Sequence, residues 1–312
     1  MTEFTSEVTA RPFNGDVDFW RVRDLLIDTY PLTPPDFNWE VRRWDGNRFH
    51  REQDKLIQES KNYHVWETAS GELAGVVNTE GGIGHAYLQL HPDYRHLIEA
   101  DMVAWAESHL TEVTDDGKQQ LSLFVYEYDL PRRLLLEKRG YEKSDDGGVV
   151  RRLRFGKRPL PAPVFPSPYQ MRPTKPDSAD YQRIADVINA GFNRTTHTAA
   201  EVGRFMTEAP CFRHDLDLVA VAPDGSFAAY VGVILEPSNR YGLFEPVCTH
   251  PAHRRQGLAQ ALMFEGLQRL KALGAQTVYV ATGDMVPANR LYDSIGFTEM
   301  YQGYWWRKQW VN

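Results

Sequence analysis

The residues that could bind an anion lie in one short segment, Val247–Ala259. The segment has an apolar start, a basic loop and a single glycine, and an apolar helical pattern follows it. The first N–H groups of a helix lack intrahelical partners and lie at the positive end of the helix dipole, so they bind anions. Gly257 would let a ligand approach the backbone, and Arg254 and Arg255 would add charge for a phosphate or pyrophosphate. The alternative is a solvated basic turn that caps the helix.

This segment resembles the acetyl-CoA-binding motif of the GCN5-related N-acetyltransferases. In that motif an Arg or Gln is followed by two residues, a Gly, one residue, and then Gly or Ala. Arg254, Gly257 and Ala259 fill those three positions. Asn289–Tyr292, followed by Gly296–Phe297, resembles the family's late helix, which flanks the pantetheine arm and carries an acid tyrosine. Together the two motifs cover most of the second half of the chain.

The resemblance implies that acetyl-CoA binds along one strand and the loop that follows it. In the family, backbone groups of that strand bond the pantetheine and can polarise the thioester carbonyl. Cys248 could suggest an acyl-cysteine mechanism, but nothing in the sequence pairs it with a base. We therefore interpret Cys248 as a small residue that packs in the core. The implied cofactor-binding residues are Val247, Cys248, Thr249, Arg254, Arg255, Gln256, Gly257, Leu258, Ala259, Asn289 and Tyr292.

Two residues are candidates for the proton transfers of acetyl transfer to an amine. A protonated amine must lose a proton before it attacks, and Glu245 is the candidate base, directly or through water. It lies two residues before Val247, so strand alternation predicts that both side chains share one face. Tyr292 could protonate the departing thiolate, because a phenol and a thiol have similar unperturbed pKa values. The alternatives are a structural pairing of Glu245 with Arg240 or another basic residue, and a packing role for Tyr292.

A proline-rich segment, residues 158–168, divides the chain near its middle. Proline fixes φ and removes backbone donors, so this segment should be an extended spacer. Three landmarks recur in the same order about 160 residues apart, which indicates duplication. We therefore predict domains at 1–157 and 169–312. The landmarks are Arg11-Pro12 with Arg172-Pro173, Leu90-His91-Pro92 with Thr249-His250-Pro251, and Pro131–Tyr141 with Pro287–Phe297.

The first copy departs from the motif of the second. Its loop is two residues shorter and contains no glycine, and Glu99 would stand where an anion must bind. Leu136 takes the place of Tyr292, and Arg133 that of Asn289. A pyrophosphate is disfavoured beside a carboxylate and with fewer free N–H donors. We expect a degenerate copy that does not bind acetyl-CoA productively.

The second half predicts the order helix, three antiparallel strands, helix, strand, helix and strand, which is mixed α/β. With the resemblance, this order implies an α+β protein of two tandem acyl-CoA N-acyltransferase folds, each a mixed, mostly antiparallel sheet flanked by helices. Trp305, Trp306 and Trp310 in the last strand could line a substrate pocket or lie between the halves. The expected helices cover 177–192, 258–273 and 287–294, and the expected strands 216–222, 227–235, 241–249, 277–281 and 298–310.

Composition narrows the classes of partner. The chain has 312 residues and a net charge of −7, which argues against nucleic-acid binding. No uncharged apolar run approaches about 18 residues and the start lacks an apolar signal region, so we expect no membrane segment. Only Cys211 and Cys248 are present, in line with a reducing cytoplasm, and the scattered histidines predict no metal site.

The resemblance therefore implies an acyltransferase that moves the acetyl group of acetyl-CoA, its cosubstrate, directly to a primary amine of a small-molecule acceptor. Aminoglycosides, polyamines, amino acids and mycothiol-type precursors remain open as acceptors, and the chain could be a monomer or a homodimer. Rival classes are a non-catalytic acyl-CoA sensor and an acyltransferase that uses a longer acyl-CoA or a protein amine. The presence of both Tyr292 and Glu245 favours the enzyme.

Overall fold

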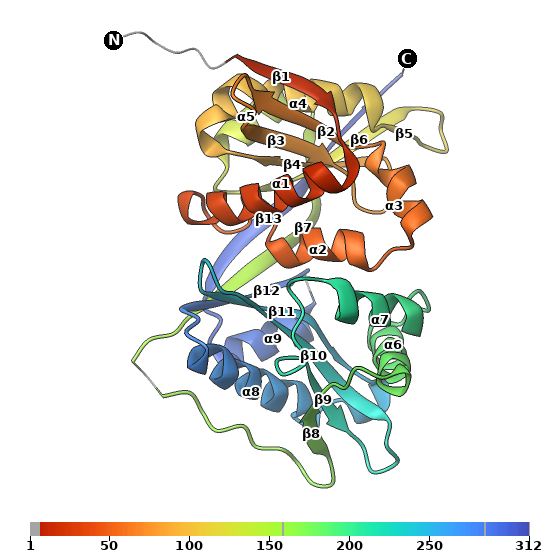
Figure 1. Cartoon of the computed structure of the whole chain (residues 1–312), viewed down its shortest axis with the longest axis vertical. Coiled ribbons are helices and arrows are strands. Elements are labelled where there is room, and N and C mark those ends of the chain that lie inside the picture. Colours follow the sequence, from red (N-terminus) through yellow and green to blue (C-terminus); the bar gives the residue numbers. More distant parts are fainter. Residues whose placement is uncertain (1–6, 158, 284, 312) are drawn as a thin grey trace. The chain divides into compact units, whose positions relative to one another are not determined.

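The chain forms two compact units (Figure 1). The computed structural model describes residues 7–157, 159–283 and 285–311, so Arg158, where the predicted linker begins, lies outside the described residues. Unit 1 comprises the described residues up to Trp44, Glu52–Gly148 and those from Tyr301 onward, and unit 2 comprises Asp45–Arg51 and Val149–Met300. Each unit therefore includes a strand segment from the other half of the chain.

Unit 1 is a mixed sheet with the strand order β1-β2-β3-β4-β6-β13-β7, and the short β5 pairs with β6. The β4–β6 pair is parallel, whereas β1–β2, β2–β3, β3–β4 and β13–β6 are antiparallel. The elements are β1 (Val8–Pro12), α1 (Gly15–Thr29), η1 (Tyr30–Leu32), α2 (Val41–Phe49), α3 (Gln53–Ser60), β2 (His64–Thr68), β3 (Leu73–Asn78), β4 (His85–Leu90), η2 (Pro92–Tyr94), α4 (Arg95–His109), β5 (Glu112–Val113), β6 (Gln119–Tyr126), α5 (Leu130–Lys138), β7 (Glu142–Arg154) and β13 (Glu299–Trp310).

The tryptophans of β13 pack on both faces of the sheet in unit 1. Trp306 is buried in the core that α4 shares with β4 and β6, and Trp310 packs against that core. Trp305 lies on the opposite face, where its ring contacts those of Phe124 at 5.3 Å and Tyr87 at 6.0 Å. The alternation of the strand thus sends neighbouring tryptophans to different environments.

Unit 2 is a sheet with the order β7-β12-β11-β10-β9-β8. Only the β11–β12 pair is parallel, and the other pairs are antiparallel. Helices α8 and α9 cover one face and α6 and α7 the other (Figure 1). The predicted mixed, mostly antiparallel sheet flanked by helices is therefore confirmed. The further elements are β8 (Gln170–Pro173), α6 (Ser178–Phe192), α7 (Ala199–Glu208), β9 (Leu218–Val221), β10 (Phe227–Glu236), β11 (Tyr241–Thr249), η3 (Pro251–His253), α8 (Leu258–Ala272), β12 (Thr277–Thr282) and α9 (Val286–Ile295).

Helix α7 is the main element of the second half that the sequence analysis missed. It begins after Thr198, whose side chain accepts a hydrogen bond from the N–H of Glu201. A Thr-x-x-Glu pattern ahead of apolar residues at helical spacing signals a helix start. The signal was therefore present, and Val202, Phe205 and Met206 form the buried face that follows it.

The two copies repeat one ion pair, between a partly exposed arginine and a buried aspartate, at their Arg-Pro landmarks. Arg11 donates to both carboxylate oxygens of Asp18, at 2.6 and 2.8 Å, and Arg172 does the same to Asp180 at 2.6 and 2.7 Å. Burial alone would raise the pKa of Asp180, but the bonds from Arg172 and from the Lys175 N–H lower it below its ordinary value. The equivalent geometry supports the duplication inferred from the landmarks.

Asp180→Asn is expected to destabilise unit 2 by about 2–4 kcal/mol at neutral pH, because it leaves Arg172 without its charged partner. The folded-state pKa of Asp180 is lowered, so its stabilisation is present above the unfolded pKa and is lost as pH falls through the folded pKa. Urea unfolding across the acid range measures this. The gap between variant and wild type should narrow below about pH 4, and a gap that stays constant would contradict the assignment.

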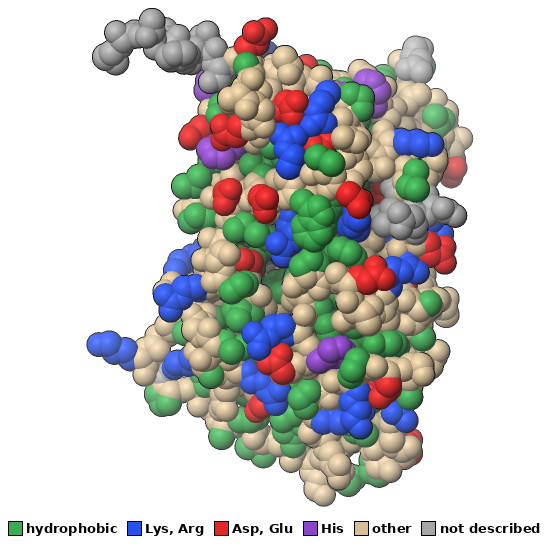
Figure 2. All heavy atoms as spheres, in the orientation of Figure 1, with side chains coloured by type: hydrophobic (Ala, Val, Ile, Leu, Met, Phe, Trp, Pro, Cys, Tyr) green, Lys and Arg blue, Asp and Glu red, His purple; other side chains and the backbone are tan. Residues whose placement is uncertain are grey.

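The described surface mixes charges of both signs. On the face drawn in Figure 2, basic and acidic side chains are interspersed over both units. Pairs such as Lys118–Asp116 and Arg213–Asp215, both at 2.6 Å, contribute to this pattern. Among the described helices, none is both long and apolar enough to cross a membrane.

Candidate functional site

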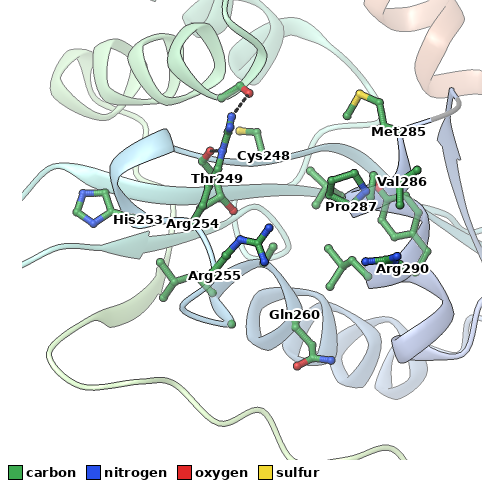
Figure 3. Close-up of a pocket in the computed structure, with 18 of the residues that line it drawn as sticks. Cys248, Thr249, His253, Arg254, Arg255, Gln260, Met285, Val286, Pro287 and Arg290 are labelled. Carbon is green, nitrogen blue, oxygen red and sulfur yellow. Dashed lines mark hydrogen bonds between the residues drawn. The ribbon is translucent and has the colours of Figure 1, made fainter.

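A pocket of about 780 Å³ opens in unit 2 where the end of β11 meets the starts of α8 and α9 (Figure 3). Within the described residues, Gln256, Asn289 and Glu245 do not line this pocket, whereas the other predicted site residues do. Those that line it are Val247, Cys248, Thr249, Arg254, Arg255, Gly257, Leu258, Ala259 and Tyr292. The structure also adds Gly191 and Phe192, from the end of α6, and an apolar stretch that begins α9.

The pocket lies where two parallel strands separate. Strand β11 pairs with β12 as far as Phe244, opposite Val280, and then continues alone on that side to Thr249. A bulge follows Phe244, because Glu245 and Pro246 together face only Gly232 of β10. A Cβ atom on Gly232 would lie 2.3 Å from the carbonyl oxygen of Glu245, so only glycine fits opposite the bulge.

The end of β11 leaves backbone groups facing the pocket. The N–H of His250 donates to the carbonyl of Ala228 at 2.9 Å. Because paired and outward-facing residues alternate in an antiparallel ladder, Cys248 bonds β10 while Val247 and Thr249 face away from it. The carbonyl of Thr249 accordingly accepts from Arg254 Nε at 3.4 Å. Val247 can therefore offer its N–H and C=O to an extended ligand in the place of a missing strand.

Among the described residues, no side chain caps the start of α8. Gly257 is the N-cap in the left-handed conformation, with φ of 78°, and it forms no side-chain cap bond. A Cβ atom there would meet nothing within 4 Å, so glycine is required by the backbone angle and not by lack of space. The first N–H groups of α8 lack intrahelical acceptors and lie at the positive end of the helix dipole, in a segment that lines the pocket.

The arginines of the loop differ in orientation. Arg254 points toward α6, where its Nη2 donates to the carbonyl of Gly191 at 2.8 Å (Figure 3). Arg255 and Arg290 point toward the open space between α8 and α9. Arg255 and Arg290 are therefore better placed to meet phosphate groups than Arg254. The sequence analysis did not single out Arg290, although it lies inside the second motif.

Tyr292 lines the pocket with only 4% of the residue exposed. Within the described residues its hydroxyl forms no hydrogen bond, so it is available to a ligand. Burial raises the pKa of Tyr292 above its ordinary value, and the charge of Glu245 acts in the same direction. The phenol therefore stays protonated throughout the neutral range, as a proton donor must.

Glu245 lies in the bulge, beside the pocket and not in its lining. Phe244 and Val247 both pack against the α8 face, so the regular alternation from which we predicted a shared face for Glu245 and Val247 does not hold here. Within the described residues Glu245 forms no ion pair, and Arg240 instead donates its Nε to the carbonyl of Gly274 at 3.1 Å. Its charge still reaches Tyr292, whose pKa it raises.

Cys248 is buried on the other face of the strand, against α6. A Cβ atom added to Gly191 would lie 2.9 Å from the Cβ of Cys248, so the two residues are in close contact. Burial raises the pKa of Cys248 to about 12. A thiol held protonated in this way is a poor nucleophile.

The corresponding place in unit 1 is closed by an internal ion network. Glu99 accepts from Arg95 at 2.7 Å and from Arg132 at 2.6 Å, and Arg95 also donates to Asp129 at 2.6 Å. Both arginines lie over the ring of Phe37, at 5.2 and 5.3 Å from its centre. The positive charges at the start of α4 are thus already paired within the protein.

Comparison with known proteins gives one family match. Residues 185–297 match the family described as "Acetyltransferase (GNAT) family", and this span contains both sequence motifs. No curated protein matches the chain.

Two solved structures resemble nearly the whole chain. A GCN5-related N-acetyltransferase from Sphaerobacter thermophilus is 21% identical, with a TM-score of 0.64 over 97% of this chain and 95% of that one. A tandem GNAT protein from the clavulanic acid biosynthesis pathway is 18% identical, with a TM-score of 0.66 over 97% and 98%. At these identities the likeness shows the fold, and it confirms the predicted tandem arrangement.

Proposed function

We propose that this chain, which matches the GNAT family over residues 185–297, is an acyltransferase that transfers the acetyl group of acetyl-CoA to a primary amine of a small molecule. Transfer would be direct, with both substrates bound at once. The observation that supports the proposal is the pocket where β11 separates from β12. Outward-facing backbone groups of β11, the uncapped start of α8 and Tyr292 all lie in this one pocket.

The features of the pocket fit the parts of acetyl-CoA. The free N–H groups of α8, with Arg255 and Arg290, would hold the pyrophosphate and phosphate groups. Val247 would bond the extended pantetheine arm with its backbone, and the apolar residues of β11 and α9 would cover that arm. Arg254 would fix the loop to α6 through Gly191.

The residues around Tyr292 supply the proton transfers. Glu245 would take the proton that the amine loses as its nitrogen bonds the acetyl carbon, through water because it does not line the pocket. The bond from that carbon to sulfur then breaks, and Tyr292 would protonate the departing thiolate. Glu245 releases its proton to solvent and the Tyr292 phenol recovers one from solvent, so neither residue is changed over a turnover.

The class of the acceptor is proposed from the net charge of the chain, and the compartment from its cysteines. The net charge of −7 favours a cationic amine over an anionic one. Cys211 and Cys248 are both free and buried, in line with a reducing cytoplasm. Either a monomer or a homodimer is compatible with the proposal.

The test is an acceptor screen with acetyl-CoA and separate pools of polyamines, amino acids and aminoglycosides. We expect CoA thiol release that depends on the amine, together with an amine product that is heavier by one acetyl group. Binding of acetyl-CoA without release in any pool would favour the non-catalytic sensor. Release only with a longer acyl-CoA, or only with a protein acceptor, would overturn the proposed donor or acceptor.

A further inference from the structure

Arg151 is a buried arginine that the first half of the chain supplies to unit 2. It lies in the last part of β7, opposite Val280 of β12, and only 5% of the residue is exposed. A buried guanidinium destabilises a protein unless good partners surround it. The partners of Arg151 therefore indicate what this residue does.

Within the described residues, the hydrogen-bond partners of the Arg151 side chain lie on α9 or just after its end. Its Nε donates to Asn289 Oδ1 at 2.9 Å, and its Nη1 donates to the Asp293 carboxylate and to the carbonyl of Phe297, the latter at 3.2 Å. Asn289 and Asp293 are four residues apart, so they lie on one side of the helix. Tyr292 lies on the turn that these two bonds span.

Asn289 extends this contact to the start of the helix. Its Nδ2 donates to the carbonyls of Gly283 and Met285, at 3.1 and 3.2 Å. Met285 and the residues after it line the pocket. Asn289, predicted as a cofactor ligand, thus uses its side chain to join Arg151 to the segment that leads into α9.

Arg151 also acts on Tyr292 through charge. It does not line the pocket within the described residues, so it acts from behind α9. Its positive charge lowers the pKa of Tyr292 and so opposes the effect of burial. Because a cation favours the phenolate, Arg151 makes the phenol a better proton donor than burial alone would allow.

We infer that Arg151 is a positioning residue for acyl transfer, holding the turn of α9 that carries Tyr292 against the pocket. Only the kinetic part of this inference rests on the proposed function, because the hold on α9 can be measured in the absence of any reaction. No separate fragment of the second half would retain it, since Arg151 precedes the proline-rich segment.

Hydrogen exchange of the full chain tests the hold on α9. Arg151→Met keeps the apolar stem and removes the guanidinium. Arg152→Met is the matched control, because Arg152 is the next residue of β7 and its Nε donates to Glu299 at 2.9 Å. We expect faster exchange over Val286–Ile295 in Arg151→Met alone, and equal exchange in the two variants would overturn the inference.

Kinetics with an acceptor from the screen test the link to Tyr292. Arg151→Met should lower kcat about 10–100-fold while the Kd for acetyl-CoA changes less than about 3-fold. In a Tyr292→Phe background the same change should lower kcat little further, because the residue that Arg151 positions no longer donates a proton. Fully additive losses would overturn the positioning role. A wild type that acetylates nothing would refute the proposed function and leave the exchange result standing.

Discussion

Gly257→Glu is expected to weaken acetyl-CoA binding at least about 100-fold, which would take it below detection by calorimetry. The new carboxylate would project from a position whose Cβ meets only open space, beside the free N–H groups of α8. There it would accept those N–H groups itself and repel the phosphates of the ligand. The left-handed φ of 78° adds backbone strain of about 1–3 kcal/mol for any side chain.

Two variants separate charge from strain. Gly225 has a φ of 85° in the turn between β9 and β10, and a Cβ atom there also meets nothing within 4 Å. Gly225→Glu should therefore be strained in the same way yet bind acetyl-CoA like the wild type. Gly257→Ala should weaken binding only a few-fold, because it adds strain without charge. Equal losses in Gly225→Glu and Gly257→Glu would show that strain, and not an anion site, explains the result.

The same titration counts the sites. We expect one site per chain, because Arg95 at the start of α4 and Arg132 of α5 are already bonded to Glu99, and Arg95 also to Asp129. A ligand phosphate there would have to displace buried carboxylates from two guanidinium groups. A second site that survives in Gly257→Glu would mean that unit 1 binds the ligand despite this network.

The local features of the site could be predicted from sequence because they depend on neighbouring residues. The end of β11, the glycine at the N-cap and the start of α8 all lie within Val247–Ala259, and their spacing alone implies a strand, an anion-binding loop and a helix. The predicted helix at 258–273 agrees with α8 to within one residue at its end. Local sequence patterns therefore predict most of the elements that line the pocket.

The remaining features depend on residues far apart in the chain. Arg151 lies 138 residues before Asn289, and no local pattern indicates that it would reach α9. Strand β13 likewise pairs with β6 of the first half, a register that its own alternating pattern does not specify. Such pairings follow from the packing of whole sheets, so they could not be derived from spacing.

The bulge in β11 shows how one irregular residue pair changes a site. Period-two counting predicted a shared face for Glu245 and Val247, but the two residues opposite Gly232 break that count. A glycine in the partner strand is a weak sign of a bulge. Without the pairing register, Gly232 could not be matched to Glu245, so the error was unavoidable from sequence.

Tyr292→Phe is expected to lower kcat about 100–10,000-fold, the range typical of losing a general acid. The Kd for acetyl-CoA should change less than about 3-fold, because the ring stays in place and its hydroxyl bonds no described residue. Stability should also be nearly unchanged for the same reason. Steady-state kinetics, calorimetry and urea unfolding of the same preparations measure the three quantities.

Tyr230→Phe is the matched control, because the hydroxyl of Tyr230 donates to Asp217 at a distance of 2.8 Å. Neither residue lines the pocket. It should lose stability and keep kcat, the reverse of Tyr292→Phe. The pKa of Tyr292 is raised above 10, so the active protonated phenol persists and Tyr292 should cause no loss of activity between about pH 7 and pH 9. If Tyr292→Phe shifted only affinity, Tyr292 would not be the acid, and the chain would fit a sensor of acyl-CoA better than an enzyme. If it removed an alkaline limb inside that range, the conclusion that burial keeps the phenol protonated there would be wrong.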